Sequence, residues 1–203
     1  TTELAVTGER AFGGIIITNR KVDAVTAAEI GKIFFEVILA PAYDDDALEI
    51  LKQKKNRIIL VSGNVRPTEK KFRSMLQGRL EQDRDAVADS PEDLTPTTTL
   101  IPTAEQVEDL LFANRIVKHS KSNAIVLAKG GMLLASGIGQ TSRVDALKQA
   151  IAKAGSFGFD LNGAVMASDA FFPFPDCVQI AHEAGIDAVI HPCGSISDQE
   201  SIN

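Results

Sequence analysis

The sequence contains no tryptophan, one tyrosine and only two cysteines among 203 residues. Cys177 and Cys193 do not form a Cys-x-x-Cys pair of the kind found in many zinc sites, so we expect no metal. No secretory leader is visible, and we therefore expect two reduced thiols in a cytoplasmic protein. No apolar run approaches the roughly 20 residues of a membrane-spanning helix, which argues against a membrane protein.

An excess of positive charge is also missing. The chain has 27 acidic and 21 basic side chains, for a net charge of −6, which argues against nucleic acid as a partner. An anionic substrate would need a local positive site. The composition, 44% hydrophobic and 24% charged, is that of an ordinary soluble globular protein.

The first half alternates β-branched apolar segments with helical patterns. Strands are predicted at 12–18, 36–40 and 57–61, and Thr26 to Glu29 has the pattern of a capping box that opens a helix. A second helix is predicted after the acidic residues 44–46. Strands that alternate with helices predict parallel pairing and an α/β layer.

Residues 62–103 contain four prolines and are predicted to be a long connection, with a short strand within 75–83. Thr103 to Gln106 is a second capping box, and apolar spacing predicts a helix that runs to about Lys118. A glycine pair at 130–131 predicts a hairpin between two strands. The later segments are predicted as a helix from about 143 that stops at Gly155, a buried strand at 164–167, a helix at 177–184 capped by Asp176, a strand at 187–190 and a last helix from Ser197.

The most unusual stretch follows that buried strand. Residues 168–176 read Ser-Asp-Ala-Phe-Phe-Pro-Phe-Pro-Asp, which places three of the ten phenylalanines and two prolines within six positions. Proline stiffens the backbone, and exposed aromatic rings are costly in water. Composition alone favours a hydrophobic plug below a loop, and an aromatic site for a flat polar ring is the alternative.

The stretch at 168–176 resembles the signature of the formyltransferase that acts on 5-aminoimidazole-4-carboxamide ribonucleotide (AICAR). That enzyme is the transformylase half of a bifunctional purine-synthesis family. Five further segments resemble the same family in order and spacing, so the resemblance covers nearly the whole chain. They are Ala-Phe-Gly-Gly-Ile at 11–15, Glu-Val-Ile-Leu-Ala-Pro at 36–41, Lys-Ser-Asn-Ala-Ile-Val at 121–126, Gly-Ile-Gly-Gln-Thr-Ser-Arg-Val-Asp at 137–145 and Ala-Val-Ile-His-Pro-Cys-Gly-Ser-Ile-Ser-Asp at 188–198.

The resemblance implies an α/β fold of two cytidine-deaminase-like α/β/α lobes without zinc. We expect a partial first lobe at 1–86, a connection at 87–102 and a second lobe at 103–203. The implied reaction moves a formyl group from 10-formyltetrahydrofolate to AICAR, within a homodimer. The implied substrate-binding residues are Gly13, Glu36, Asn123, Arg143 and Phe171, and the implied folate-binding residues are Val144, Asp176, Ser195 and Ile196.

Each of these residues also has a simpler interpretation. Asn123 offers donors and an acceptor that suit a carboxamide, but an amide at this position is equally typical of a turn. Arg143 follows two glycines at a predicted helix start, where anions or carbonyls bind, although a surface arginine is the plainer alternative. Asp176 is most simply a helix N-cap, which does not exclude a contact with the pterin.

The family's catalytic Lys-His pair belongs to a segment that precedes the Ala-Phe-Gly motif, so we expect it to lie outside this sequence. Lys118-His119 matches a different segment and is interpreted as the end of a helix. We therefore expect a fragment that does not turn over alone, from a parent that also has IMP cyclohydrolase activity. A non-catalytic binding or dimerisation module of the same fold is the alternative. A zinc deaminase is disfavoured, because the His-x-Glu and Pro-Cys-x-x-Cys signature is missing.

Overall fold

The computed structural model describes residues 13–63 and 68–202, and the chain divides into two compact units between Ala86 and Val87. Each unit has its own sheet and its own hydrophobic core. The fold is mixed α/β throughout, as the alternating sequence pattern predicted.

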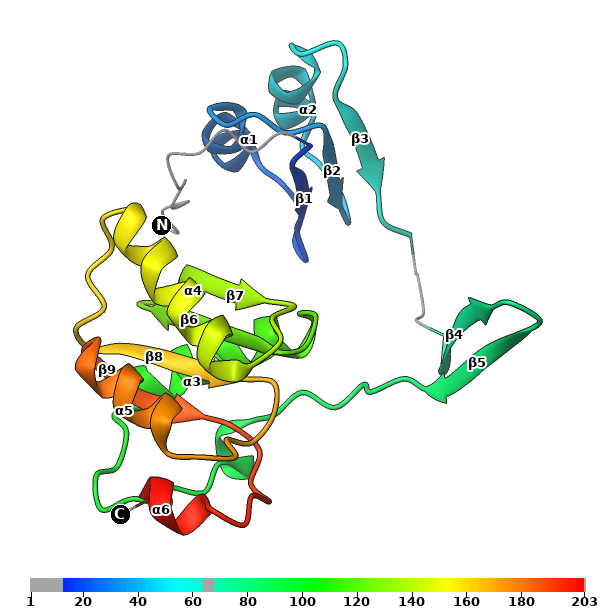
Figure 1. Ribbon diagram of the computed structural model, residues 1–203. Coiled ribbons are helices and arrows are strands. Elements are labelled where there is room, and N and C mark those ends of the chain that lie inside the picture. The colour runs from blue at the N-terminus through cyan, green and yellow to red at the C-terminus, as the bar shows by residue number, and fades with distance from the viewer. Residues whose placement is uncertain (1–12, 64–67, 203) are drawn as a thin grey trace. The chain divides into compact units, whose positions relative to one another are not determined.

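The first unit is built on a three-stranded parallel sheet in the order β1-β2-β3 (Figure 1). Helices connect the successive strands, as parallel pairing requires. The elements are β1 (Ile15–Ile17), α1 (Ala24–Gly31), β2 (Val37–Ala40), α2 (Asp45–Lys52), β3 (Ile58–Val61), β4 (Lys70–Met75) and β5 (Gly78–Asp83).

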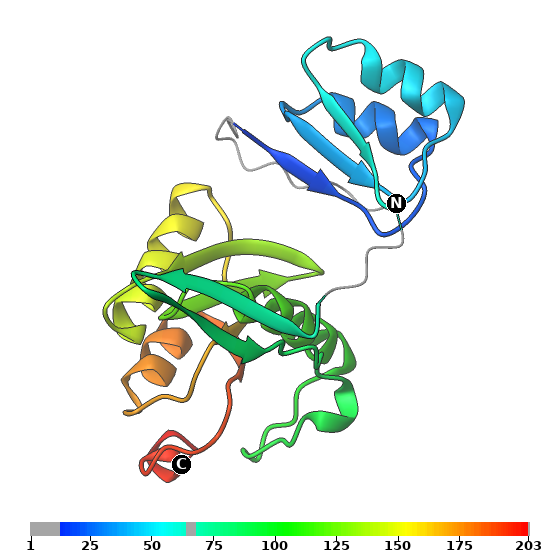
Figure 2. The same ribbon diagram turned by 90° about the vertical axis from the view of Figure 1, so that its right-hand side faces the viewer.

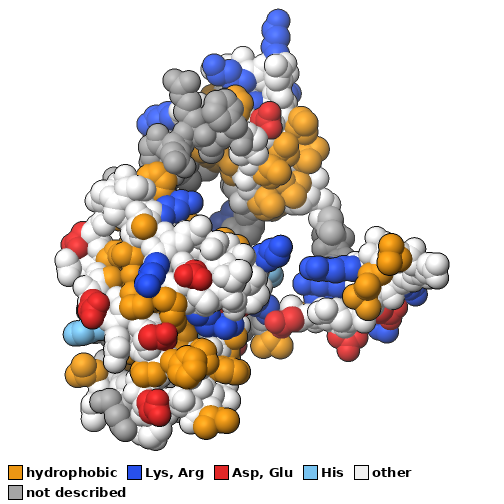
Figure 3. Space-filling view, in the orientation of Figure 1, with side chains coloured by type: hydrophobic (Ala, Val, Ile, Leu, Met, Phe, Trp, Pro, Cys, Tyr) orange, Lys and Arg blue, Asp and Glu red, His pale blue; other side chains and the backbone are white. Residues whose placement is uncertain are grey.

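Both helices of this unit pack on the same face of the sheet. Ile38 of β2 is fully buried, together with Ala27 of α1 and Leu51 of α2. The opposite face carries apolar side chains that stay exposed, by 70% for Ile17 and 52% for Ile58. Figure 3 shows hydrophobic side chains gathered over these strands. Within residues 13–63 and 68–86 the unit therefore has two layers, not the three layers that a complete lobe implies.

The segment predicted to be a long connection with a short strand within 75–83 contains a hairpin, and β5 is the strand predicted there. Strands β4 and β5 pair antiparallel, with Met75 opposite Gly78, so the turn has two residues. Every residue of both strands is exposed. Basic and hydrophobic side chains share one side of this hairpin in Figure 3. Charged residues interrupt the alternation of apolar and polar side chains from which a strand is predicted, so β4 was not predicted.

The first helix begins earlier than its sequence pattern predicted. Asp23 is the N-cap of α1, and its side chain accepts a hydrogen bond of 2.7 Å from the Thr26 backbone N–H. The predicted capping box with Thr26 as its first residue is therefore wrong, because Thr26 lies inside the first turn. Hydrogen bonds from the backbone N–H and the side chain of Thr26 lower the pKa of Asp23.

The second unit is a four-stranded mixed sheet in the order β7-β6-β8-β9. Strand β6 runs antiparallel to both of its neighbours, and β8 pairs parallel with β9. The elements are the 3₁₀ helix η1 (Pro91–Asp93), α3 (Ala104–Lys118), β6 (Ala124–Lys129), β7 (Met132–Ile138), α4 (Arg143–Ser156), β8 (Ala164–Ser168), α5 (Asp176–Glu183), β9 (Ile186–Ile190) and α6 (Asp198–Ile202).

Helices cover both faces of this sheet, so the second unit has three layers (Figures 1 and 2). Side chains of β6 alternate between the two faces: Ile125 and Leu127 pack toward α4 and α5, while Val126 packs toward α3. All residues of β8 are buried, and a strand covered on both faces reads as a continuous apolar run. This explains why Ala164 to Ala167 predicted a buried strand.

The helix ends of this unit confirm two sequence predictions and correct two others. Thr103 and Gln106 form the predicted capping box of α3, and that helix ends at Lys118. Helix α4 continues through Gly155 to Ser156, so the predicted stop at Gly155 is wrong. Asp176 is the first residue of α5 and not its cap, because the N-cap is Pro175. Among the residues that the structure describes, no helix is both long and apolar enough to cross a bilayer.

Candidate functional site

One edge of the four-stranded sheet gathers most of the predicted site residues. Strand β6 begins at this edge, and β7, β8 and β9 all end there, as their pairing registers require. The segments that leave this edge carry Asn123 before β6, Arg143 after β7 and Phe171 after β8. Chain segments separated by tens of residues therefore supply one surface, a relationship that the sequence alone does not show.

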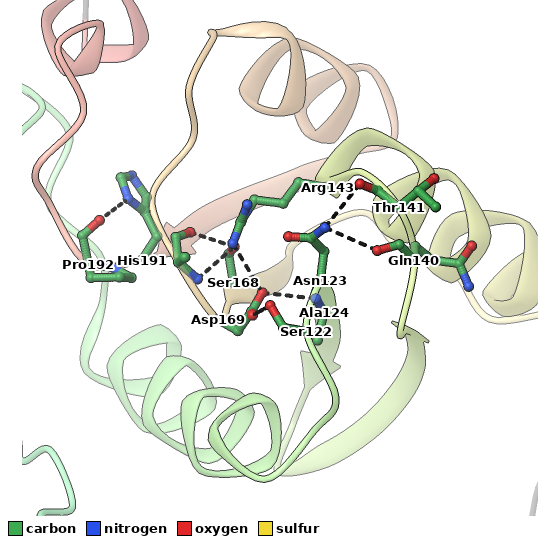
Figure 4. Close-up of polar contacts among 11 residues, drawn as sticks. Ser122, Asn123, Ala124, Gln140, Thr141, Arg143, Ser168, Asp169, His191 and Pro192 are labelled. Atoms are coloured by element: carbon green, nitrogen blue, oxygen red, sulfur yellow. Dashed lines mark hydrogen bonds and ion pairs between the residues drawn. The ribbon is translucent and has the colours of Figure 1, made fainter. Parts of the chain in front are cut away.

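Asp169 is the centre of the polar contacts at this edge (Figure 4). Its Oδ1 accepts a hydrogen bond of 2.9 Å from the Ala124 backbone N–H and lies 3.6 Å from Nη2 of Arg143. Its Oδ2 accepts a hydrogen bond from the Ser122 hydroxyl. The sequence pattern assigned no role to Asp169. The available signal was its position directly after a buried strand.

The Arg143 side chain is the cation of the site. It is the first residue of α4, which the Ser142 hydroxyl caps by accepting from the Asp145 backbone N–H at 3.0 Å. Only 18% of the Arg143 side chain is exposed, and its Nε is buried with no hydrogen-bond partner among the described residues. A buried donor without a partner costs about 1–3 kcal/mol, so this guanidinium has hydrogen-bonding capacity to offer a ligand.

The Asn123 amide is held by the segment that precedes α4. Its Nδ2 donates to the Gln140 carbonyl at 3.0 Å and to the Thr141 carbonyl at 3.2 Å. Backbone hydrogen bonds of 3.3 Å also join Asn123 and Gln140 in both directions. Both amide hydrogens are thus committed within the protein. The capacity of Asn123 toward a ligand lies in its side-chain oxygen, not in the donors considered from the sequence.

The two adjacent phenylalanines of the signature have different environments. Phe172 is fully buried, and its ring centroid lies 4.7 Å from that of His191. Nδ1 of His191 donates to the Pro192 carbonyl at 2.8 Å. Phe171 is 42% exposed. Phe172 therefore has the buried position that a hydrophobic plug predicts, and the Phe171 ring, one residue earlier, is partly exposed to solvent.

The residues assigned to the folate side lie in three neighbouring segments. Val144 follows Arg143 and packs partly against the core, and Asp176 opens α5. Ser195 lies in the loop after β9, where its backbone N–H donates to Asp198 at 3.2 Å. Ile196 in the same loop is fully exposed. Exposure makes Ile196 available to a ligand, while the hydrogen bonds to Asp198 fix the loop that presents it.

Burial makes Cys177, next to Asp176, a poor nucleophile. The side chain is 1% exposed, and this desolvation, reinforced by the neighbouring Asp176 carboxylate, raises the pKa of its thiol to about 12. The thiolate is the reactive form of cysteine, so Cys177 stays unreactive near neutral pH. Its contribution is to the core of the second unit.

The remaining two predicted residues belong to the first unit and are neighbours there. Gly13 precedes β1 and Glu36 precedes β2, at the amino ends of paired parallel strands. Gly13 has φ of +75°, and a β-carbon added to it would lie 3.5 Å from a Glu36 carboxylate oxygen. The Glu36 backbone N–H donates to the Gly14 carbonyl at 2.9 Å. The positive φ favours glycine at this position, while the Glu36 carboxylate lies at ordinary contact distance from the site of a β-carbon.

No group of three or more metal-ligating side chains occurs in residues 13–63 and 68–202. His119 is exposed and forms the C-cap of α3, donating its backbone N–H to the Ile116 carbonyl at 3.1 Å. This is the helix-end position predicted from the sequence.

Comparison of the chain with known proteins identifies similar sequences in one family. A family model described as AICARFT/IMPCHase bienzyme matches residues 4–153. The chain is 66% identical over 198 residues to the bifunctional purine biosynthesis protein PurH of Bacteroides thetaiotaomicron, which covers 98% of this chain and 39% of that relative. The PurH proteins of Aquifex aeolicus and Ruminiclostridium cellulolyticum are 53% and 49% identical, and each match covers 95% of this chain.

The matches cover 38% of the length of the Aquifex aeolicus and Ruminiclostridium cellulolyticum proteins. The chain therefore spans well under half the length of the curated relatives it matches. The order and spacing of the six motifs agree with a relationship along nearly the whole chain. The chain belongs to the AICARFT/IMPCHase bienzyme family.

Proposed function

We propose that this chain forms part of an AICAR formyltransferase, which moves a formyl group from 10-formyltetrahydrofolate to the 5-amino group of AICAR in purine biosynthesis. The observation that carries the proposal is the convergence of Asn123, Arg143 and the 168–176 signature at one edge of the second unit's sheet. Family membership supports a role in purine biosynthesis, and the geometry at this edge supports the assignment of individual residues.

Three residues at this edge suit the AICAR base. Arg143 has donors for a carbonyl oxygen, and the side-chain oxygen of Asn123 can accept from an amide. The exposed ring of Phe171 can stack on a flat imidazole. Gly13 and Glu36 complete the proposed substrate-binding set, on the basis of the family resemblance.

The proposed folate contacts come from the starts of α4 and α5 and from the loop after β9. The Asp176 carboxylate can accept hydrogen bonds from a pterin, and exposed Ile196 offers an apolar contact for a ring face. Val144 and Ser195 complete this set. These residues position the one-carbon donor, and none of them acts as the proton-transfer group.

Formyl transfer has two demands that these residues do not meet. The AICAR amine is a weak nucleophile because its lone pair is delocalised, so a base must take its proton. The formyl oxygen becomes negative in the tetrahedral intermediate and needs donors. We assign both roles to the family's Lys-His pair outside this sequence, so the chain should bind ligands without turnover.

The wider assembly is part of the same proposal. We infer a cytoplasmic homodimer whose two units correspond to cytidine-deaminase-like lobes, 1–86 and 103–203, joined by residues 87–102. The longer protein would also carry IMP cyclohydrolase activity. The PurH relatives, named as bifunctional, support this last inference.

Calorimetry with AICAR and with a non-reactive folate analogue tests the proposal directly. We expect the 203-residue chain to bind AICAR, and Arg143→Lys to weaken that binding at least tenfold because a bidentate donor is lost. Arg115→Lys, a change at an exposed position on α3, is the matched control and should bind AICAR normally.

Two results would contradict the proposal. One is a folded chain that binds neither ligand at millimolar concentration. The other is formyl transfer by this chain that His119→Ala abolishes, because it would give the helix-end histidine the catalytic role. Ligand binding without turnover, in a protein never joined to a cyclohydrolase, would instead favour the non-catalytic module.

A further inference from the structure

The Asp169 carboxylate joins three separate segments of the second unit at a single side chain. It belongs to the segment after β8, accepts a hydrogen bond from the start of β6 and pairs with the first residue of α4 (Figure 4). Only 14% of its side chain is exposed, so these contacts are largely shielded from water. Shielded charge pairs are stronger and more directional than pairs on the surface.

The two oxygens of this carboxylate have separate partners. Oδ2 accepts from the Ser122 hydroxyl, which fixes the rotation of the carboxylate. Oδ1 accepts from the Ala124 backbone N–H and faces Nη2 of Arg143. The guanidinium is planar, so one contact at Nη2 restricts the direction of its remaining N–H groups. Ser122 therefore acts on Arg143 through Asp169.

The pairing also changes the net charge at the site. The Arg143 cation next to the Asp169 anion sums to zero, which removes most of the attraction that a lone guanidinium has for a phosphate or sulfate. The donors of Arg143 remain, and Nε has no partner among the described residues. A neutral acceptor such as a carboxamide oxygen can use these donors without an additional charge.

We propose that Asp169 is a positioning and specificity-determining residue: it orients the Arg143 guanidinium and cancels its charge, so that this site takes a neutral polar group rather than an anion. The identity of the ligand as AICAR rests on the function proposed above. The orientation and the charge selectivity do not, and they can be measured without AICAR.

Three variants separate the two effects in the 203-residue chain. Asp169→Asn removes the charge and keeps an acceptor for the Ala124 N–H, while Ser122→Ala loosens the carboxylate and keeps its charge. Asp187→Asn removes one exposed carboxylate near the start of β9 and is the charge-matched control. The start of β9 lies at the other end of the strands from Asp169.

The Arg143 Nε–H signal in ¹⁵N-edited NMR, identified by its loss in Arg143→Lys, reports the orientation. We expect slow rotation about the Nε–Cζ bond in the parent chain and in Asp187→Asn. We expect rotation at least five times faster in Asp169→Asn and in Ser122→Ala. Unchanged rotation in both of these variants would overturn the positioning role. If Asp169→Asn fails to fold, Ser122→Ala decides this point.

Titration with inorganic phosphate, followed through the same signal, reports the charge selectivity. We expect phosphate to bind Asp169→Asn at least fivefold more tightly than it binds the parent chain, and to bind Ser122→Ala and Asp187→Asn as it binds the parent. Arg143→Gln combined with Asp169→Asn should lose the gain, as judged from backbone amide signals of α4. Equal phosphate affinity in all variants would contradict the selectivity.

AICAR binding completes the design and keeps the two proposals distinguishable. Asp169→Asn and Ser122→Ala should each weaken AICAR binding at least threefold. The thermal unfolding temperature of Ser122→Ala should equal that of the parent chain. If the parent chain binds no AICAR while the NMR results hold, the function proposed above fails and the positioning role stands. If AICAR binds the parent and Asp169→Asn equally well, the specificity role fails.

Discussion

Gly137 of β7 lies directly against the backbone of Ala146 in α4. A β-carbon added to Gly137 would lie 1.9 Å from the Ala146 carbonyl oxygen, far inside van der Waals contact. The close approach brings α4 onto the sheet at the point where the helix presents Arg143. A glycine that the family motif contains is thus explained by packing.

Gly137→Ala should therefore shift α4 and destabilise the second unit by about 3 kcal/mol or more, at the upper end of overpacking costs. It should also weaken AICAR binding, because Arg143 moves with the helix. Gly155→Ala is the control within α4: apart from the helix's own backbone and the adjacent residues, no atom lies within 4 Å of the added carbon, and alanine favours a helix by about 1 kcal/mol. Urea unfolding of both variants checks this, and equal stabilities would refute the packing argument.

The adjacent phenylalanines of the signature should have opposite effects. Phe172→Ala removes a fully buried ring and should cost about 3–5 kcal/mol of unfolding free energy. Phe171→Ala truncates a ring that is 42% exposed, so stability should change by less than about 1 kcal/mol while AICAR binding weakens. Calorimetry and thermal unfolding on the pair separate the two roles. A large loss of stability in Phe171→Ala would argue for core packing alone.

The two cysteines should differ strongly in reactivity. Cys193 is exposed and Cys177 is buried with a pKa of about 12, so iodoacetamide at pH 8 should label only Cys193 in the folded chain. Mass spectrometry of Cys193→Ser should then find no rapid labelling. Rapid modification of Cys177 would contradict its buried position.

The raised pKa of Cys177 also predicts a dependence of stability on pH. The unfolded thiol loses its proton near pH 8.5, and the folded thiol only near pH 12. The stabilising contribution is therefore complete below about pH 8.5 and is lost as the pH rises toward 12. Urea unfolding between pH 8 and 10.5 should show a steeper decline for the parent than for Cys177→Ala.

The Asp109 carboxylate of α3 holds the turn between β6 and β7. It accepts 2.7 Å and 2.6 Å hydrogen bonds from the backbone N–H groups of Gly130 and Gly131. Asp109→Ala should leave two turn donors unpaired and cost about 2–4 kcal/mol. Glu108→Ala, at the exposed neighbouring position, should change stability by less than about 0.5 kcal/mol. Matching losses in the two variants would exclude this role for the carboxylate.

The local elements that could be predicted were those whose sequence pattern has a direct physical cause. The glycine pair at 130–131 predicted the β6–β7 hairpin, and the capping box at Thr103 predicted the start of α3. The continuous apolar run at 164–167 predicted a buried strand. In each case the signal and the structure depend on residues within a few positions of each other.

Two of the errors concern helix caps, where a neighbouring residue takes the predicted role. Asp23, three residues earlier, caps α1 in place of Thr26, and Pro175 replaces Asp176 as the N-cap of α5. Strand β4, and with it the β4–β5 hairpin, was missed because every residue of β4 is exposed, and a strand without a buried face lacks the alternating apolar pattern.

By itself the sequence determined the α/β class, most of the helices and strands, and a set of motifs spaced as in one enzyme family. Only the tertiary structure decided that Asp169 links Ser122, Ala124 and Arg143, and that Phe171 is exposed while Phe172 is buried. The physical reason is the order of strand pairing. Hydrogen bonding between β6, β7 and β8 brings residues 20 to 50 positions apart to one edge of the sheet, and no local pattern records that distance.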